Sequence, residues 1–460
     1  MSSGGSMAHD LRLVLPQLIV LLTAMLALVA EMLRWRRAGL GCVAVGLGAA
    51  TVVSAGRLAV HTTAFSGTFR IDLLNHWSVL ILCPTAVLCC LLARQELRGT
   101  PREGTVYSLL CFGTLGALVL AGSGDVMLLV LGLLMISLSG FALAAYAKTE
   151  AGTEGAMKYF IYGTVTTAIL VFGLSFWVGI TGSTLLSALG RSNLPAPLLA
   201  FGFVAVLTGL GYAASVFPFH FWTPDTLEGA PVSVAAYLSV VPKIGAFFGL
   251  AQVCRSLPAA AVDWPLVLAL LAVASMTFGN VLALLQTNVV RLLAYSTVAQ
   301  AGFFLLPLVG MSGATALPAL VVFAAAYAAM NTGAFAIVLH AGRTLADFKR
   351  LGTTHIFTGL AMTVFLFSLV GIPPLAGFMG KLLLFESAMV AGYTWLVVVA
   401  VLNSAIALAV YSKIIVAMYF AVPVGFGSPA PPAPAWEIRT VVGACLLVTL
   451  VLTLAAQAFF

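Results

Sequence analysis

Charged side chains are scarce in this sequence. Aspartate, glutamate, lysine and arginine make up 8% of the 460 residues, whereas hydrophobic residues make up 62%. A soluble domain carries roughly a quarter of its residues as charges, so this composition excludes the soluble classes and indicates a polytopic membrane protein. The net charge is +7. Arginine and lysine hold loops on the cytoplasmic side of a membrane, so we attribute this excess to topology and expect no nucleic-acid partner.

Motifs for metals, redox centres and soluble catalysis are also missing. The seven cysteines lie in apolar runs and lack the paired spacings of zinc or iron–sulfur sites, so we interpret them as small buried hydrophobic residues. No glycine-rich phosphate loop follows a predicted strand, and there is no room for a soluble catalytic domain. We therefore expect no catalytic residue, no metal and no cofactor on this chain, and no redox active site.

The apolar runs predict an all-α protein with about 14 transmembrane helices. The predicted spans are 11–32, 39–60, 73–93, 105–124, 125–147, 158–182, 196–219, 230–254, 264–286, 290–310, 313–341, 356–385, 390–420 and 437–459. With this count, the loops richest in arginine and lysine all fall on one side of the membrane. The positive-inside rule places those loops in the cytoplasm and both termini on the periplasmic or outer side.

Two of the predicted helices contain breaks, at Pro218 and at Pro373-Pro374. Proline removes a backbone donor and clashes with the preceding turn, and a broken helix is tolerated in a bilayer only where protein or water surrounds it. Each break falls in the fourth span of a five-span group. An odd number of spans gives the two groups opposite orientation, which predicts two inverted five-helix repeats.

The predicted organisation therefore has four parts. They are three N-terminal helices (1–100), a first repeat with its break at Pro218 (101–255), a second repeat with its break at Pro373 (256–424), and a linker followed by the last helix (425–460).

Ionisable residues within the spans are candidates for proton transfer. Each costs about 2.5–3.5 kcal/mol at the centre of a membrane helix, so each needs a reason to be there. Lys243 and Lys381 lie well inside apolar runs, which favours proton transfer over lysines that reach the headgroups. His220 follows Pro218 by two residues and is either a proton relay or a satisfied polar group in the kink.

For the other charged and polar residues, the sequence is compatible with two roles each. Lys158 lies four residues after Glu154 and either forms an interfacial ion pair or takes part in proton transfer. Asp225 and Glu228 follow the first break, where they either cap the next helix or mark the point where protons enter. Polar residues of spans nine to eleven either line a hydrated path or hold helices together: Asn288, Tyr295, Ser296, Gln300 and Asn331.

Several motifs together resemble subunit N of the proton-pumping NADH–quinone oxidoreductase, respiratory complex I. They are FPFHFWTPD at 217–225, EGAP at 228–231, RLLAYS at 291–296, NTGAF at 331–335 and GIPPLAGFMGK at 371–381. The resemblance implies an antiporter-like membrane subunit that helps translocate protons as partner subunits reduce quinone. It also implies a bacterial cytoplasmic (inner) membrane location, with antiporter-like neighbours, other membrane subunits and lipid as partners.

The sequence departs from this family at two charged positions. Leu134 stands where the fifth span normally carries a glutamate, and Ala213 stands where the seventh normally carries a lysine. The resemblance implies that this pair gates one half of the channel. Its joint loss is electrostatically neutral, so the fold can survive. Three readings remain: a proton-translocating subunit, a structural non-pumping subunit of such a complex, and a subunit of a related cation/proton antiporter or ion-uptake complex.

Overall fold

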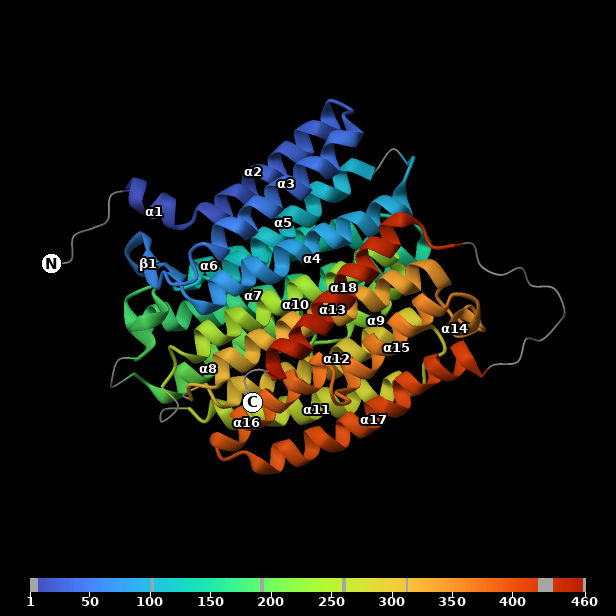
Figure 1. Cartoon of the computed structure of the whole chain (residues 1–460). Helices are drawn as coiled ribbons and strands as arrows, with labels where there is room; N and C mark the ends of the chain where they lie inside the picture. The colour runs from blue at the N-terminus through green and yellow to red at the C-terminus, as the bar shows by residue number, and fades with distance from the viewer. Residues whose placement is uncertain are drawn as a thin grey trace.

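The computed structural model describes residues 7–100, 103–190, 194–258, 262–311, 313–420 and 433–457. Within these ranges the chain forms an elongated bundle of long helices that run along one common direction (Figure 1). Most of the predicted linker, residues 425–432, lies outside the described residues.

The first half of the chain contains α1 (Met7–Leu13), α2 (Leu15–Met32), α3 (Arg36–Ala55), β1 (Thr62–Ala64), η1 (Phe65–Gly67), β2 (Phe69–Ile71), α4 (Leu73–Leu97), α5 (Glu103–Ala121), α6 (Val126–Ala144), α7 (Glu150–Thr181), η2 (Leu186–Gly190), α8 (Ala196–Ala214) and α9 (Trp222–Gly229). The second half contains α10 (Val232–Cys254), α11 (Trp264–Leu284), α12 (Val289–Val309), α13 (Ala316–Ala341), α14 (Leu351–Thr354), α15 (Ile356–Val370), α16 (Ala376–Val390), α17 (Thr394–Tyr419) and α18 (Trp436–Gln457).

The 14 predicted spans each correspond to a helix or a broken helix of the structure. In the described part of the chain, 12 helices are long and apolar enough to cross a membrane. The two remaining crossings are α3, whose apolar part is shorter, and the pair α15 and α16, which a break divides. The all-α polytopic fold is therefore confirmed.

Both helix breaks are unwound segments rather than simple kinks. Helix α8 ends at Ala214, five residues earlier than predicted, because Ser215 adopts a left-handed conformation with φ 58°. Pro218 then lies within the non-helical segment before α9. At the second break α15 ends at Val370, and Gly371 turns the chain with φ 91°, a conformation that glycine adopts without strain. Pro373 and Pro374 lie between α15 and α16, as predicted.

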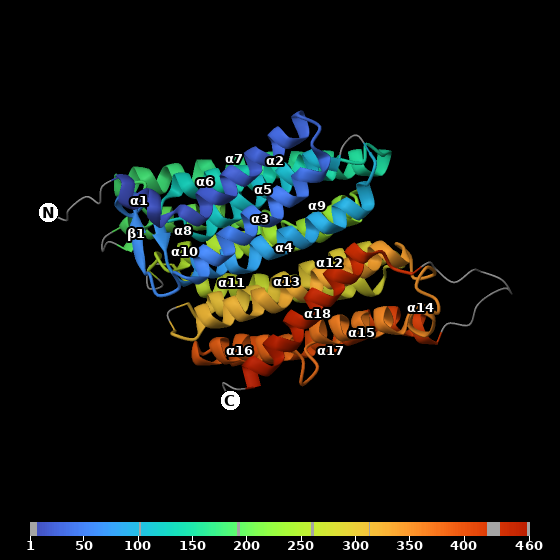
Figure 2. The same cartoon turned by 45° about the horizontal axis from the view of Figure 1, so that its top comes forward.

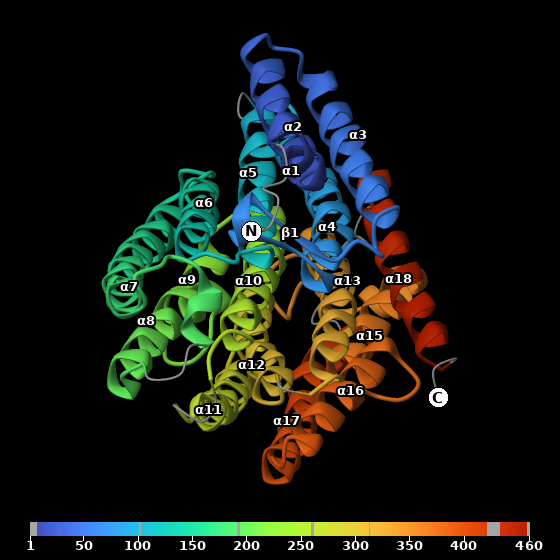
Figure 3. The same cartoon turned by 90° about the vertical axis from the view of Figure 1, so that its left-hand side faces the viewer.

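Helix α10 occupies the centre of the bundle and separates two groups of helices. Seen from the end, α6 to α9 lie on one side, and α13 to α17 lie on the other, with α10 and α12 between them (Figure 3). Every residue of α10 is buried. Any polar side chain on this helix must therefore find its partners inside the protein.

Helix α18 runs across the outside of the bundle and contacts α4, α13, α15 and α16 (Figure 2). Its start is held against α4, because Arg94 lies 3.8 Å from the buried carboxylate of Glu437 and stacks over the Trp436 ring at 5.5 Å. The C-terminal helix thus connects the N-terminal helices to the second half of the chain.

The sequence does not predict the short β1–β2 hairpin between α3 and α4. Arg70 on β2 anchors it by donating to Gln252 Oε1 at 2.9 Å and to Ser256 Oγ at 2.8 Å. Burial lowers the pKa of Arg70, and the repulsion of Arg255 lowers it further, while Asp72 raises it. Asp72 also pairs with Arg255 at 2.5 Å, so the hairpin fixes the end of α10 at this side of the bundle.

Candidate functional site

Lys243 lies in the middle of α10 with 1% of its surface exposed. Its Nζ donates a hydrogen bond to Ser215 Oγ, and the same oxygen accepts from Thr223 Oγ1 at 2.7 Å. The Trp222 ring lies 5.7 Å from Nζ, within the range of a cation–π contact. In the described part of the chain no carboxylate pairs with this lysine. The first helix break therefore supplies Lys243 with neutral partners only.

His220 lies in the same unwound segment and is 4% exposed. Its ring lies 5.5 Å from the Phe217 ring and 4.9 Å from the Phe221 ring. Among the described residues, no group hydrogen-bonds its Nδ1. Within the described residues, the unwound segment therefore leaves this ring nitrogen without a hydrogen bond.

Lys381 lies in α16, immediately after the second break, and is 3% exposed. Its Nζ donates to the carbonyl of Val370 at 2.8 Å and to Ser404 Oγ at 3.2 Å, and lies 3.9 Å from the centre of the Phe303 ring. Val370 is the last residue of α15, where free carbonyls carry the negative end of the helix dipole. The carbonyl at the second break therefore stabilises the positive charge of the Lys381 ammonium.

The two lysines share one geometry. Ser215, which accepts from Lys243, directly follows the last residue of α8, and Val370, which accepts from Lys381, ends α15. Each buried ammonium thus lies at the C-terminal end of the first half of a broken helix. Beside Lys381 a cavity of about 160 Å³ opens. Its lining residues are Gly371, Phe378, Lys381, Leu382, Phe385, Val401 and Ser404.

Buried polar groups lie between the two lysines. Asn331 Nδ2 donates at 2.7 Å to Ser239 Oγ, which lies one helical turn from Lys243 on α10. Gln300 Nε2 donates at 3.1 Å to the carbonyl of Leu369, next to the residue that holds Lys381. Three buried oxygens in this region have no partner among the described residues: Asn331 Oδ1, Gln300 Oε1 and Thr332 Oγ1. Buried polar atoms of this kind are normally satisfied by water.

A cluster of alternating charges lies where α7, α9 and α12 meet. Lys158 Nζ lies 2.6 Å from both Glu154 and Asp225, which confirms the predicted pair with Glu154. Arg291 then bridges Asp225 and Glu228, each at 2.7 Å. These five side chains form one continuous network that joins the two halves of the chain.

The capping role considered for Asp225 and Glu228 is wrong. The first amides of α10, those of Val232 and Ser233, donate instead to the Glu96 carboxylate at 2.8 and 2.9 Å. The end of α4 packs against the start of α10 and brings this carboxylate to the free N–H groups. Asp225 and Glu228 are instead engaged by the basic side chains of Lys158 and Arg291.

Three residues of this site do not stand out in the sequence. Ser215 lies inside the break but carries no charge, and Arg291 opens the RLLAYS motif without any sign in the sequence of its two acidic partners. Glu96 carries no signal, because the amides it binds lie 136 residues further along the chain.

Leu134 and Ala213 occupy different environments. Leu134 lies on the outer face of α6 with 38% of its surface exposed, whereas Ala213 is completely buried in α8. In the described part of the chain no carboxylate forms an ion pair with Lys243 or with Lys381.

A family model and two similar relatives place this chain in the same family of membrane subunits. Residues 123–407 match the family described as NADH:quinone oxidoreductase/Mrp antiporter, TM. The sequence is 38% identical to NADH-quinone oxidoreductase subunit N 1 of Streptomyces griseus over 89% of both chains. It is also 38% identical to F(420)H(2) dehydrogenase subunit N of Methanosarcina mazei, over 80% of this chain and 78% of the relative.

Solved structures agree with this assignment. A chain of respiratory complex I from Thermus thermophilus superimposes with a TM-score of 0.83 and 30% identity, over 96% of this chain and 97% of that one. A chain of the Mrp complex from Dietzia sp. shares the fold, with a TM-score of 0.85 at 19% identity, over 98% and 96% of the two chains. The chain therefore belongs to the NADH:quinone oxidoreductase/Mrp antiporter family of membrane subunits, and within it to the subunit N type of complex I.

Proposed function

We propose that this chain translocates protons as a membrane subunit of a complex I-type assembly, driven by quinone reduction in partner subunits. The observation that carries the proposal is the pair of buried lysines, Lys243 and Lys381, each held by neutral oxygens at a helix break. A buried ammonium without a carboxylate partner is costly to keep, because its desolvation is not repaid by an opposite charge. Such a lysine is suited to accept and release a proton.

The proposed path begins at the charge cluster of Lys158, Asp225 and Glu228, whose side chains are partly exposed. It continues through His220 and Lys243 at the first break. The buried polar groups around Asn331 and Gln300 then lead to Lys381 and the cavity beside it. The unpartnered oxygens along this line support bound water, which would complete a chain of hydrogen bonds.

Relatives with different electron donors support a role that does not depend on the donor. The name of one relative specifies an NADH-quinone oxidoreductase and that of another an F(420)H(2) dehydrogenase, at the same identity of 38%. In our proposal the electron donor is chosen by other subunits, and this chain carries neither redox centre nor cofactor.

A structural, non-pumping subunit is the second candidate function. Leu134 and Ala213 favour it, because the family resemblance implies a glutamate and a lysine at these places. Ala213 is completely buried, and the nearby ammonium of Lys243, which donates to Ser215, has no acidic partner among the described residues. In this reading the first half of the chain keeps the broken helix as architecture.

Proton stoichiometry separates the two functions. The assembly is reconstituted in sealed vesicles, and protons moved per quinone reduced are measured for Lys243→Met and Lys381→Met. Lys413→Met is the matched control, because Lys413 donates to the carbonyls of Leu284 and Gln286 at the end of a span and is not a member of the proposed path.

A lower proton yield in the first two variants, with the control unchanged, supports translocation through this chain. An unchanged yield in both variants overturns that proposal and supports the structural subunit. Sodium or bicarbonate flux without electron transfer would instead support a cation/proton antiporter or ion-uptake subunit.

A further inference from the structure

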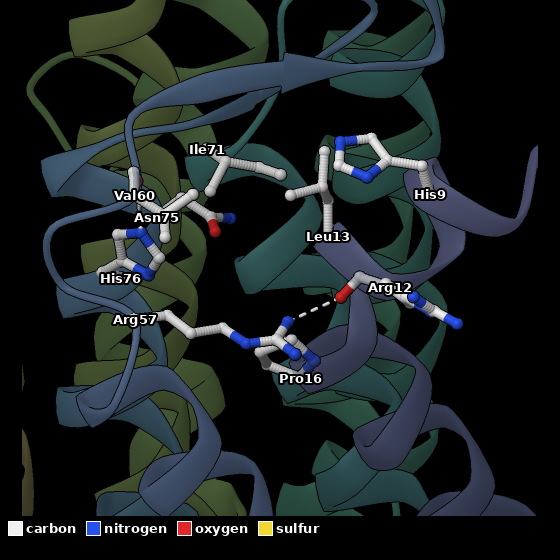
Figure 4. Close-up of a pocket in the computed structure, with 9 residues that line it drawn as sticks. All are labelled: His9, Arg12, Leu13, Pro16, Arg57, Val60, Ile71, Asn75 and His76. Atoms are coloured by element: carbon white, nitrogen blue, oxygen red, sulfur yellow. Dashed lines mark hydrogen bonds between the residues drawn. The ribbon is translucent and has the colours of Figure 1, made fainter. Parts of the chain in front are cut away.

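A basic pocket lies at the end of the bundle where the chain begins, far from the two lysines. It has a volume of about 170 Å³ and lies between α1, the start of α2, the segment after α3 and the start of α4 (Figure 4). Its lining includes His9, Arg12, Arg57, Val60, Asn75 and His76. No carboxylate is among the residues that line it.

Both arginines of this pocket lack an acidic partner in the described part of the chain. Arg57 reaches under the pocket and donates to the backbone carbonyl of Arg12 at 2.5 Å, which fixes its guanidinium (Figure 4). The Arg12 backbone carbonyl faces Arg57, whereas the Arg12 side chain points away from Arg57 at the edge of the pocket (Figure 4). At the same end of the bundle, Arg255 is neutralised by Asp72. Within the described residues, the arginines of this pocket therefore carry positive charge that no carboxylate compensates.

The two arginines lie next to the ends of membrane-spanning helices, where we expect lipid headgroups. Helix α2 begins at Leu15 and α3 ends at Ala55, so Arg12 and Arg57 lie within three residues of the ends of these spans. Basic side chains at span ends meet the phosphate layer of a bilayer. Below the pocket, α2 and α3 expose apolar side chains, including Leu22 at 57% and Val52 at 72%.

We propose that this pocket binds the headgroup phosphate of an anionic phospholipid, whose acyl chains lie along the exposed faces of α2 and α3. Guanidinium groups suit this ligand, because their planar N–H donors match two phosphate oxygens at once. The apolar wall below the arginines distinguishes a lipid from a free anion, which needs no such surface. The site does not depend on the proposed proton path.

Binding is tested on the purified, delipidated assembly by native mass spectrometry during titration with phosphatidylglycerol. Each arginine near the membrane surface contributes about 1 kcal/mol to the binding of an anionic lipid, which corresponds to about fivefold in affinity. We expect Arg12→Gln and Arg57→Gln each to weaken one binding event about fivefold, and the double variant about 25-fold. Arg98→Gln removes the same charge at the exposed far end of α4, so it serves as the matched control.

Three outcomes would overturn the proposal. They are equal lipid binding in all variants, equal retention of phosphatidylcholine at this site, and displacement of phosphatidylglycerol by inorganic phosphate at the same concentration. The last would identify a site for soluble anions. Within the described residues the Arg12 side chain makes no hydrogen bond that the fold needs, so Arg12→Gln keeps the test valid even where Arg57→Gln disturbs the packing of α1.

Discussion

Replacing Ser215 by alanine should destabilise the protein, because this hydroxyl holds two buried donors. It accepts from the ammonium of Lys243 and from the hydroxyl of Thr223. A hydrogen bond to a charged group contributes about 1.5–3 kcal/mol, and one between neutral groups about 0.5–1.5 kcal/mol. The expected loss in the free energy of unfolding is therefore about 2–4.5 kcal/mol, the larger part from Lys243.

The contribution of Lys243 can be isolated with a second substitution. Methionine has a similar volume and no charge, and replacing a buried charge that lacks an opposite partner by a hydrophobic residue is often neutral or stabilising. Lys243→Met should therefore cost less than Ser215→Ala. In the Lys243→Met background, Ser215→Ala should cost only the bond to Thr223, about 1 kcal/mol.

The assay is a double-mutant cycle in which each variant is unfolded by increasing denaturing detergent in mixed micelles. The difference between the two Ser215→Ala costs is the coupling energy, which we expect at about 1.5–3 kcal/mol. A coupling within about 0.5 kcal/mol of zero would refute the reasoning, because independent sites add to that accuracy. It would mean that Lys243 does not depend on the hydroxyl at the first break.

Three further predictions use the same unfolding assay. Glu96→Ala should lower the free energy of unfolding by about 0.5–2 kcal/mol, because the first amides of α10 lose their cap. Glu96→Gln should lower it less, and an equal loss in the two variants would contradict the capping role. Gly377→Ala should lower the free energy of unfolding by about 1–3 kcal/mol or more, because the added Cβ would lie 1.7 Å from the carbonyl oxygen of Ser368. Gly48→Ala is the control and should be tolerated, because its added Cβ meets nothing within 4 Å. Ala213→Lys alone should lower the free energy of unfolding by about 3–5 kcal/mol, because it adds an unpaired charge at a completely buried position; an unchanged stability would indicate that an acidic partner reaches this position.

The sequence predicted the fourteen crossings well because each depends on a local property. A run of about 20 apolar residues is long enough to span a membrane, whatever it packs against. Errors appeared where backbone conformation decided the boundary. The helix predicted over 196–219 ends at Ala214, since the left-handed Ser215 stops it before the proline that the sequence signals. The β1–β2 hairpin escaped prediction because its strands have three residues each.

Side-chain partners were harder to predict than helices. The pair Glu154–Lys158 follows from helical spacing, and the structure confirms it. The partners of Asp225 did not follow from spacing, since Arg291 lies 66 residues further along the chain. The same applies to the first amides of α10, which donate to the Glu96 carboxylate and not to Asp225 or Glu228, although these two lie nearer in the sequence.

The sequence by itself determined where the membrane helices lie, where two of them break, and which lysines lie inside apolar helices. These features depend on the lengths of apolar runs and on the missing backbone donor of proline, so they can be read without knowing any contact. Only the tertiary structure decided what each lysine meets. Lys243 reaches a serine 28 residues away in the chain, and Lys381 reaches the end of the preceding half-helix, because the packing of α8, α10, α15 and α16 brings those oxygens within hydrogen-bonding distance.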